Sequence, residues 1–554
     1  MKIKPKQKAF VLLIWLIFPL VINNNLNFSQ DQKIRLDNLK ESGSYVVSFI
    51  HINGNWSATT SYDWCYGEGT WQEPYVIENV TIDASGSPIG YGIYIQDSNV
   101  FFIIQNCKIY NSADYGIYLE AVNNSRIINN NCSNNNYAGI AVMYEASNNT
   151  ISGNIVNDNS DDGIYFYDYC YNNTILGNTV NNNSGVGISI HWYSNNTIIT
   201  ENYANNNGYC GIELYDWCGY NKISNNIITS NQERGIDLEY QSNNNIISDN
   251  IINNNGVYGI YLESGCDSNI IMHNTVNNDS YGISIDTICD YNIIKGNTIR
   301  DNINYGVYLA GGGEDSYSIY NEFTENILFK NNCGIYIDSD SNNNTSFKNF
   351  FVKNQKHAID DGVDNNWNNT VIGNYWDNYT GTDPDEDGIG NIPYPYISGS
   401  AGSIDYLPIV DDGDPRITIN LPTGSSSFGS IAPSFNVEIN DKYLHEMWYT
   451  LDGGLNNYTF RENGTINQIA WDLVPEGNVI IRFYARDMAR NQAYEEVSVI
   501  KSVSAGGLDP GVIAVIVVIS VLGGITIIGA ILIILVKRGK ISLEKLKSFS
   551  IRKK

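Results

Sequence analysis

Basic side chains are scarce in this 554-residue chain, which has 32 Lys and Arg against 59 Asp and Glu. Four of the lysines lie in the first 30 residues, and the stretch from 537 holds eight basic residues and one acid. The part between has 20 basic and 58 acidic residues, a net charge of about −38. Such a surface repels nucleic acid, and it suits cations, neutral sugars or basic partners.

The chain also lacks the signs of two common repeat classes. It has no regular leucine framework, and its repeat is too short and too rich in Ile, Val, Tyr, Thr, Asn and Gly for a helical repeat. Instead, a Gly-Ile-Tyr-Leu-like run returns about every 24 residues. The repeat glycines are Gly92, Gly116, Gly139, Gly163, Gly187, Gly211, Gly235, Gly259, Gly282, Gly306 and Gly334.

This period predicts a parallel β-helix with two or three short strands per coil. In the coil that begins at Gly163, Ile164 and Phe166 would point inward and Tyr165 and Tyr167 outward, because strand side chains alternate. About 12 coils at a spacing of ~4.8 Å would form a rod on the order of 60 Å long. An Ile-Ile-x-x-Asn motif keeps step with the glycines, so we expect an asparagine ladder at one corner, where left-handed backbone angles are tolerated. Its members are Asn130, Asn154, Asn178, Asn202, Asn226, Asn250, Asn274, Asn297, Asn326, Asn349 and Asn374.

Cysteine pairs of the Cys-x-x-Cys type, which would suggest a metal centre, are absent, and the cysteine count of nine is odd. Cys266 and Cys289 each follow a repeat glycine by seven residues, in adjacent coils. Adjacent coils place Cα atoms about 5 Å apart, which is inside the disulfide window. The sequence leaves two alternatives, a Cys266–Cys289 disulfide and a stack of buried free thiols.

Both ends of the chain carry apolar segments. Lysines precede an apolar run within residues 1–30, which predicts a secretory signal peptide or an uncleaved N-terminal anchor. Residues 511–536 are apolar and uncharged for long enough to form one transmembrane helix. The basic tail 537–554 would lie in the cytoplasm and everything upstream outside the cell, where Asn-x-Ser/Thr sequons are open to glycosylation.

The last coil runs into an acidic loop that matches the first part of an EF-hand-type calcium loop. Position 12 of this loop is Tyr394 and not an acid, so calcium affinity should be weak unless another acid such as Asp405 closes the loop. An acidic turn that caps the solenoid is the alternative interpretation. The candidate calcium ligands are Asp383, Asp385, Asp387, Ile389 and Asn391.

Residues 415–503 have no 24-residue period. Runs at 435–439, 447–451 and 479–485 alternate like strands, with turn signals at 452–454 and 462–464. These short strands predict an immunoglobulin-like β-sandwich.

Three stretches resemble the NosD-like right-handed parallel β-helix proteins of the pectin-lyase-like group: Pro-Tyr-Val-Ile-Glu-Asn at 74–79, the coils themselves, and Gly-Asn-Tyr-Trp at 373–376 with the acidic loop after it. The resemblance covers residues 45–410. It implies an all-β protein, a right-handed β-helix followed by the sandwich. Founding members are linked to copper delivery, which needs soft or imidazole ligands. The five His and five Met of this chain are scattered, and we see no copper site.

Outward positions of the glycine-led strands carry stacked carboxylates. Adjacent coils would place them about 5 Å apart, close to the separation in retaining glycosidases, and crowding raises their pKa. The candidate catalytic residues are Glu213, Asp237, Glu239, Glu263 and Asp286. The candidate ligand-binding residues are Tyr165, Tyr167, His191, Tyr215 and Tyr261.

Three functional hypotheses follow. The first is a membrane-anchored extracellular protein that binds glycans or cell-surface partners without turnover. The second is a polysaccharide hydrolase or lyase at the acidic face, and the third is a structural spacer of the cell surface. We prefer the first because the basic companions of β-helix lyases and polygalacturonases are missing, apart from Arg234 beside a repeat glycine.

Overall fold

The computed structural model describes residues 45–313 and 316–502, which divide into one unit up to Asp411 and a second from Asp412. The predicted signal or anchor in 1–30, the transmembrane helix 511–536 and the basic tail 537–554 lie outside the described residues. In the described part, no helix is both long enough and apolar enough to cross a membrane.

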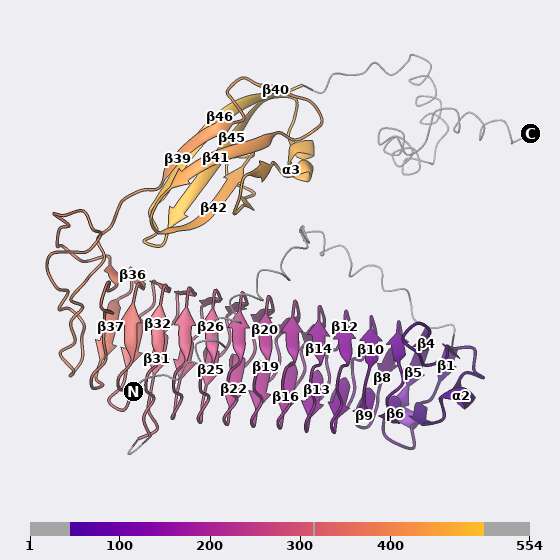
Figure 1. Ribbon diagram of the computed structural model, residues 1–554. Coiled ribbons are helices and arrows are strands. Elements are labelled where there is room, and N and C mark those ends of the chain that lie inside the picture. Colours follow the sequence, from indigo (N-terminus) through magenta and orange to yellow (C-terminus); the bar gives the residue numbers. More distant parts are fainter. Residues whose placement is uncertain (1–44, 314–315, 503–554) are drawn as a thin grey trace, which may run out of the picture. The chain divides into compact units, whose positions relative to one another are not determined.

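The first unit is a parallel β-solenoid (Figure 1). A typical coil has three short strands: β13 (Ile164–Tyr167), β14 (Thr174–Leu176) and β15 (Thr179–Asn181). Each strand pairs in parallel with the equivalent strand of the next coil, so that Ile164 lies opposite Ile188, 24 residues later. The sequence period is therefore the length of one coil, as predicted.

Equivalent strands form long sheets that run along the solenoid (Figure 1). The glycine-strand sheet consists of β2 (Ile50–Asn53), β6 (Ile93–Ser98), β9 (Ile117–Val122), β11 (Ile140–Met143), β13, β16 (Ile188–His191), β19 (Cys210–Tyr215), β22 (Arg234–Glu239), β25 (Tyr258–Leu262), β28 (Tyr281–Ile285), β31 (Tyr305–Leu309), β34 (Cys333–Ile337) and β37 (Lys356–Asp360).

The second sheet follows one corner later in each coil. It consists of β3 (Cys65–Tyr66), β4 (Tyr75–Glu78), β7 (Phe102–Gln105), β10 (Ser125–Ile128), β12 (Thr150–Ser152), β14, β17 (Ile198–Thr200), β20 (Lys222–Ser224), β23 (Ile246–Ser248), β26 (Ile270–Met272), β29 (Ile293–Lys295), β32 (Glu322–Thr324) and β35 (Thr345–Phe347).

The third face begins with a short sheet of β1 (Tyr45–Val47), β5 (Val80–Asp83) and β8 (Lys108–Tyr110). Isolated bridges continue it to β15. Its remaining strands are β18 (Tyr203–Asn205), β21 (Ile227–Thr229), β24 (Ile251–Asn253), β27 (Thr275–Asn277), β30 (Thr298–Arg300), β33 (Ile327–Phe329), β36 (Phe350–Val352) and β38 (Tyr375–Trp376).

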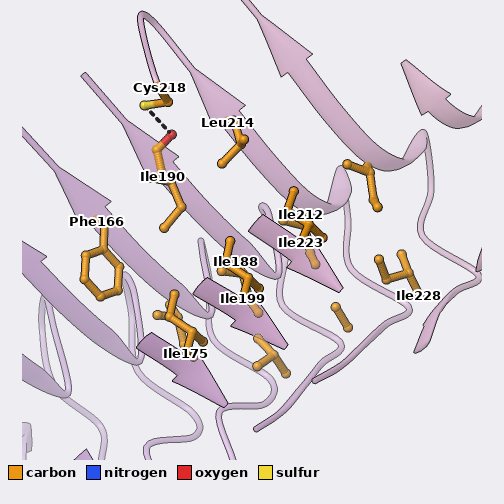
Figure 2. Close-up of a cluster of buried hydrophobic side chains, with 14 of the residues drawn as sticks. Phe166, Ile175, Ile188, Ile190, Ile199, Ile212, Leu214, Cys218, Ile223 and Ile228 are labelled. Atoms are coloured by element: carbon orange, nitrogen blue, oxygen red, sulfur yellow. Dashed lines mark hydrogen bonds between the residues drawn. The ribbon is translucent and has the colours of Figure 1, made fainter. Parts of the chain in front are cut away.

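Side chains from all three faces fill the interior (Figure 2). Ile164 and Phe166 are fully buried, while Tyr165 and Tyr167 of the same strand face outward and are half-buried. This confirms the predicted alternation. Each buried Ile contributes roughly 2 kcal/mol of hydrophobic stabilisation, so the repeating Ile positions hold each coil on its neighbours.

Asparagines form ladders at three corners, and not at one as we predicted. In the predicted ladder, Asn154 donates from its backbone N–H and its Nδ2 to Oδ1 of Asn178, both at 2.9 Å. Its Nδ2 also donates to the carbonyl of Ile127 in the preceding coil, at 2.8 Å. The second ladder includes Asn149, Asn173, Asn221, Asn245, Asn269, Asn292, Asn321 and Asn344, and the third includes Asn135, Asn159, Asn183, Asn207, Asn231, Asn255, Asn302, Asn331 and Asn354.

The left-handed backbone angles belong to the residue before the ladder asparagine, at every ladder member except Asn374, and not to the asparagine itself. Gly177, Glu201 and Asn225 have φ of 62°, 58° and 57°. Each turns the chain at the corner, which directs the next side chain inward to join the ladder.

All nine cysteines are buried free thiols. The Cys266 N–H donates to Sγ of Cys289 at 3.2 Å, so the two residues are close. Their thiols instead point to carbonyl oxygens of their own turns, those of Glu263 at 3.1 Å and Asp286 at 3.0 Å. The predicted Cys266–Cys289 disulfide is therefore not formed, and the alternative of stacked thiols describes the structure. The Cys218 thiol likewise points to a carbonyl oxygen, that of Ile190 in the preceding coil, at 3.3 Å (Figure 2).

Both ends of the solenoid are capped. The short helix α2 (Trp56–Thr59) precedes β3, which pairs antiparallel with β4 of the first coil, and the 3-10 turn η4 (Ala84–Gly86) follows β5. At the other end, Trp376 stacks between Phe351 and Tyr394, with ring centroids 4.3 Å apart on each side. Tyr394 is 1% exposed, so it closes the apolar core. This explains why an aromatic residue occupies position 12 of the acidic loop.

The second unit has two β-sheets around its own core. Buried Phe435, Trp471, Ile481 and Phe483 lie between them. One sheet contains β39 (Arg416–Leu421), β41 (Ser434–Asn440) and β44 (Gly464–Thr465). The other contains β40 (Ser427–Phe428), β46 (Gln492–Lys501), β45 (Gly477–Asp487), β42 (Leu444–Thr450) and β43 (Tyr458–Thr459), and the helix α3 is Gln468–Leu473. The immunoglobulin-like assignment stays a prediction.

Candidate functional site

The predicted carboxylates lie on the outer face of the glycine-strand sheet, in its middle coils. Glu213 of β19 lies opposite Asp237 of β22, and Asp237 lies opposite Tyr261 of β25. Contrary to the expectation for outward positions, Glu213 is 6% exposed, Asp237 0% and Tyr261 5%. Large neighbouring side chains on the same face cover them, so this face has a small polar core of its own.

Arg234 organises the centre of this polar core. Its Nη1 donates to a carboxylate oxygen of Asp237 and to one of Glu239. Its guanidinium lies over the ring of Tyr261, 4.5 Å from the centroid, and 5.3 Å from that of Tyr209. A cation over an aromatic face is attracted by the ring quadrupole. Tyr261, a predicted ligand-binding residue, is therefore covered by Arg234.

Asp237 is a buried acid with only one of its two carboxylate oxygens in hydrogen bonds. Burial raises the pKa of Asp237 well above its usual range, while Arg234 acts in the opposite direction. Its Oδ2 also accepts from Sγ of Cys210 at 3.5 Å, whereas its Oδ1 has no hydrogen-bond partner in the part of the chain that the structure describes. One ligand atom each from Cys210, Glu213 and Asp237 lie within 4.8 Å of one another, so these three could hold a metal ion.

His191 and Glu213 form the second half of the polar core. Nε2 of His191 lies 2.7 Å from Oε2 of Glu213 and 2.8 Å from Oγ of Ser189. Asp162 lies near this pair, and burial, with the neighbouring charge of Asp161, raises the pKa of Asp162 to about 7. Such a pKa suits proton transfer near neutral pH, although the carboxylates themselves are little exposed.

Glu263 and Asp286 continue the column of Glu239 and are half-buried. Burial raises the pKa of Glu263, and the charges of Glu239 and Asp286 add to this effect. The structure thus brings Glu213, Asp237 and Glu239 together in one cluster and places Glu263 and Asp286 at its edge.

A row of exposed aromatic rings borders this face, at the corner where each glycine-led strand ends. We name it the aromatic strip. Its members are 40–45% exposed, one in each of five successive coils. They are Tyr144, Tyr169, Trp192, Trp217 and Tyr240.

Every member of the strip has a left-handed backbone, with φ between 52° and 61° except for Tyr240 at 47°. Bulky residues rarely adopt this conformation, and each instance costs on the order of 1 kcal/mol or more. Hydrogen bonds between coils hold these turns: the N–H of Tyr169 donates to the carbonyl of Trp192, and that of Trp217 to the carbonyl of Tyr240, both at 2.9 Å. Left-handed residues occur at many other corners of the coils as well, so the strip is set apart by the exposure of its aromatic rings.

The acidic loop brings Asp383, Asp385 and Asp387 together, with ligand atoms within 4.8 Å. The Asp383 carboxylate accepts N–H groups of Asp387 at 3.1 Å and Gly388 at 2.7 Å. Two other residues considered for this loop, Asn391 and Asp405, use their side chains in other hydrogen bonds. Oδ1 of Asn391 accepts from the N–H of Thr382 at 3.1 Å.

Asp405 does not close this loop. It is fully buried, and Oδ2 accepts from the N–H of Asn374 at 2.7 Å and from Nε1 of Trp376 at 2.9 Å. The suggestion that Asp405 completes the ligand set is therefore wrong, because this acid satisfies the donors at the end of the last coil.

Two family descriptions match the solenoid. One, for the right-handed beta helix region, matches residues 48–226, and the other, for the periplasmic copper-binding protein NosD, matches 181–331 and 316–381. The solenoid is a NosD-like right-handed β-helix. A cell surface glycoprotein of Methanothermus fervidus is 31% identical over 202 residues, 33% of this chain. The match spans 31% of the length of that relative.

Solved structures that are similar to part of this chain are so at low identity. The periplasmic alginate epimerase AlgG is 15% identical, with a TM-score of 0.35, over 58% of this chain and 84% of that one. The A-module of a mannuronan C-5 epimerase from Azotobacter vinelandii is 15% identical, with a TM-score of 0.36, over 52% and 93%. These likenesses bear on no activity of this chain.

Sequence reasoning missed the aromatic strip of the NosD-like β-helix and most of the residues that bury its polar core. The strip lies just beyond the strand positions that the period defines. The signal that could have found it is an aromatic residue 5 or 6 positions after five successive repeat glycines, from Gly139 to Gly235. Two predicted residues have a role beside the strip: Tyr167 contacts Trp192 at 5.9 Å, and Tyr215 contacts Tyr240 at 5.0 Å, between ring centroids.

Proposed function

We propose that this chain is a cell-surface protein that binds linear glycans along the aromatic strip without cleaving them. The aromatic strip is the main evidence for this proposal. The C–H faces of sugar rings pack on aromatic rings, and five exposed rings, one in each of five successive coils, offer such contacts along an extended chain. Successive coils are about 4.8 Å apart, a spacing comparable with the length of one sugar unit.

An extracellular location is supported by the relative from Methanothermus fervidus, which is a cell surface glycoprotein. The predicted signal or anchor, the predicted membrane span 511–536 and the basic tail support the same location and a single-pass anchorage. Glycans of the same or a neighbouring cell would then be the accessible partners.

Binding is favoured over hydrolysis or elimination by the state of the carboxylates. Asp237 and Glu239 are held by Arg234, and Glu213 is held by His191. All three are almost fully buried, so a substrate would have to displace these partners before it met a free acid or base. The polar core instead stabilises the face beside the strip.

The strip can be tested by replacing two of its members. We expect Trp192→Ala with Trp217→Ala to weaken retention on the best-bound immobilised polysaccharide at least tenfold, because buried aromatic contacts are typical hot spots worth about 1.4 kcal/mol or more. Tyr220→Ala is the matched control, since Tyr220 is 66% exposed and left-handed but lies at another corner.

Equal losses in the two variants would contradict the assignment of binding to the strip. Retention of no polysaccharide by the unaltered protein would contradict the proposed function itself.

We also propose that the acidic loop binds calcium weakly. Three clustered carboxylates supply hard oxygen ligands, and without a bidentate acid at position 12 the expected dissociation constant is roughly 0.1–1 mM. Calcium at a few millimolar should raise the unfolding temperature of the protein, and Asp385→Asn should abolish the rise. A rise that persists in this variant would place the ion elsewhere.

A further inference from the structure

The aromatic strip has an internal alternation that the sequence period does not require. Each turn after a glycine-led strand has two left-handed residues, and the first of them alternates between an aromatic and an aspartate over five coils. In order, the first positions are Tyr144, Asp168, Trp192, Asp216 and Tyr240. Like residues therefore recur every second coil, about 10 Å apart.

The second turn positions behave differently. Tyr169, Tyr193 and Trp217 stack on one another, with centroid separations of 5.1 Å and 5.8 Å and interplanar angles of 5° and 12°. Tyr193 is therefore stacked on both sides, whereas Tyr169 and Trp217, at the two ends of this column, stack on Tyr193 from one side only and stay 40% and 44% exposed.

Each aromatic residue at a first turn position contacts a tyrosine of the glycine-strand sheet and is also exposed to solvent. Tyr167 contacts both Tyr144 and Trp192, and Tyr215 contacts Tyr240. No ring contact joins Tyr144 to Trp192 or Trp192 to Tyr240 within the described residues. These three rings are therefore fixed, exposed and separated by one coil each.

The two aspartates between them are half-buried. Neither Asp168 nor Asp216 forms an ion pair with any residue in the described part of the chain. Their turns are fixed by backbone bonds, such as the Tyr193 N–H to the Asp216 carbonyl at 3.0 Å. Each carboxylate therefore lies on a fixed turn without an ion-pair partner, although His191, when protonated, acts on the charge of Asp216.

We propose that the strip recognises a β-1,4-linked chain of amino sugars, an inference that rests on the proposed glycan-binding function. In such a chain alternate rings are turned over, so equivalent groups recur every second sugar. One ring packs its C–H face on Tyr144, Trp192 or Tyr240, and the ammonium group of the next ring meets Asp168 or Asp216. Charge-assisted hydrogen bonds of this kind are stronger than neutral ones.

The negative charge of the protein also favours a cationic glycan over an anionic one. Residues 31–536 carry a net charge of about −38, so a polyuronate is repelled. A neutral glucan can stack on the rings, but it leaves the two carboxylates without a cationic partner.

The test uses the full-length protein in detergent and four β-1,4-linked hexasaccharides: glucosamine, N-acetylglucosamine, glucose and a uronic acid. Calorimetry or interferometry at low salt should give the glucosamine hexamer about tenfold higher affinity than the glucose hexamer, with the uronate weakest. Raising the salt concentration should reduce this preference. Affinity should also rise in steps of two sugars between the dimer and the hexamer.

Asp168→Asn with Asp216→Asn should remove the preference for the amine and leave glucose hexamer affinity unchanged. Asn tolerates left-handed angles, so the turns should keep their shape. Glu145→Gln is the matched control, because Glu145 is an exposed acid at a second turn position of the same row, with φ of 56°.

The outcomes separate the two proposals. Equal affinity for the glucosamine and glucose hexamers, or the same loss in Glu145→Gln as in the Asp168/Asp216 variant, would overturn the amino-sugar inference while glycan binding stands. Failure of every hexamer and every longer polysaccharide to bind would overturn both.

Discussion

Asp279 is the one acid in the third asparagine ladder. Its Oδ1 accepts from the backbone N–H of Asn255 at 2.6 Å and from its Nδ2 at 3.2 Å, as an asparagine would. Its Oδ2 is buried without a hydrogen-bond partner among the described residues, because a carboxylate lacks the Nδ2 donor of the other members. Burial raises the pKa of Asp279 to about 7.

Asp279→Asn should therefore stabilise the β-helix, and more so as the pH rises. The folded pKa of about 7 lies above the ordinary value near 3.9, so the folded state holds the extra proton between these pH values. Stability contributed by this site is present below about pH 4 and is lost as the pH approaches 7. At pH 8 we expect the variant to gain about 2–4 kcal/mol in the free energy of unfolding, measured by denaturant titration.

The pH dependence is the decisive part of this test. Asn231→Asp, in the same ladder, is the matched control and should show the opposite sign. A gain for Asp279→Asn that stays constant from pH 4 to pH 8 would contradict the account.

At this scale, the sequence predicts inward residues well and outward ones poorly. Ile164 and Phe166 follow from alternation along a single strand. The burial of Asp237 could not be predicted, because it depends on Arg234, Tyr209 and Tyr261, which come from three successive coils and meet only after folding.

The coil is the structural element of the first unit. Each coil contacts mainly the coil before and the coil after it, through parallel strands, stacked Ile side chains and the three asparagine ladders. In such a solenoid, stability is approximately a sum of coil and nearest-neighbour terms. A whole coil can therefore be removed without changing the register of the remaining coils, whereas part of a coil cannot.

Removal of residues 177–200, one full coil of 24 residues between β14 and the end of β17, should leave a folded solenoid. The deletion joins Leu176 to Glu201, and every strand and ladder position keeps an equivalent neighbour. We expect cooperative unfolding with a midpoint lower by only a few degrees. Circular dichroism during heating measures this.

A half-coil deletion, residues 177–188, supplies the contrast. It shifts strands against corners, so it should abolish folding or give an aggregating protein. Comparable stability in the two deletions would show that the register of the coils is unimportant.

At the scale of elements, the period predicted the strands but only one of the three asparagine ladders. The Ile-Ile-x-x-Asn motif marks one corner clearly, whereas the other ladder members lie in runs such as Asn181-Asn182-Asn183, where the buried asparagine cannot be told from its exposed neighbours. The cysteine register was correct, but spacing alone does not show where a thiol points, and both thiols turn to carbonyl oxygens.

For the whole molecule, the order of solenoid and second β-unit follows from the sequence, and the predicted strands at 435–439 and 479–485 lie within β41 and β45. The functional surface does not follow as readily. The outward register predicts exposed carboxylates, but these acids build the polar core of one face, and the exposed aromatic surface lies at the adjoining corner. A surface is a property of the folded assembly of coils, and no single repeat contains it.

Glycan binding without cleavage is tested by a glycan array probed with the purified protein, beside an assay for reducing ends and unsaturated products on the same glycans. We predict retention of linear glycans, loss of retention in the Trp192/Trp217 variant, and no product after prolonged incubation. The contrary result would be product release that Glu239→Gln abolishes, which would make the acidic face an active site and the strip its substrate-binding surface.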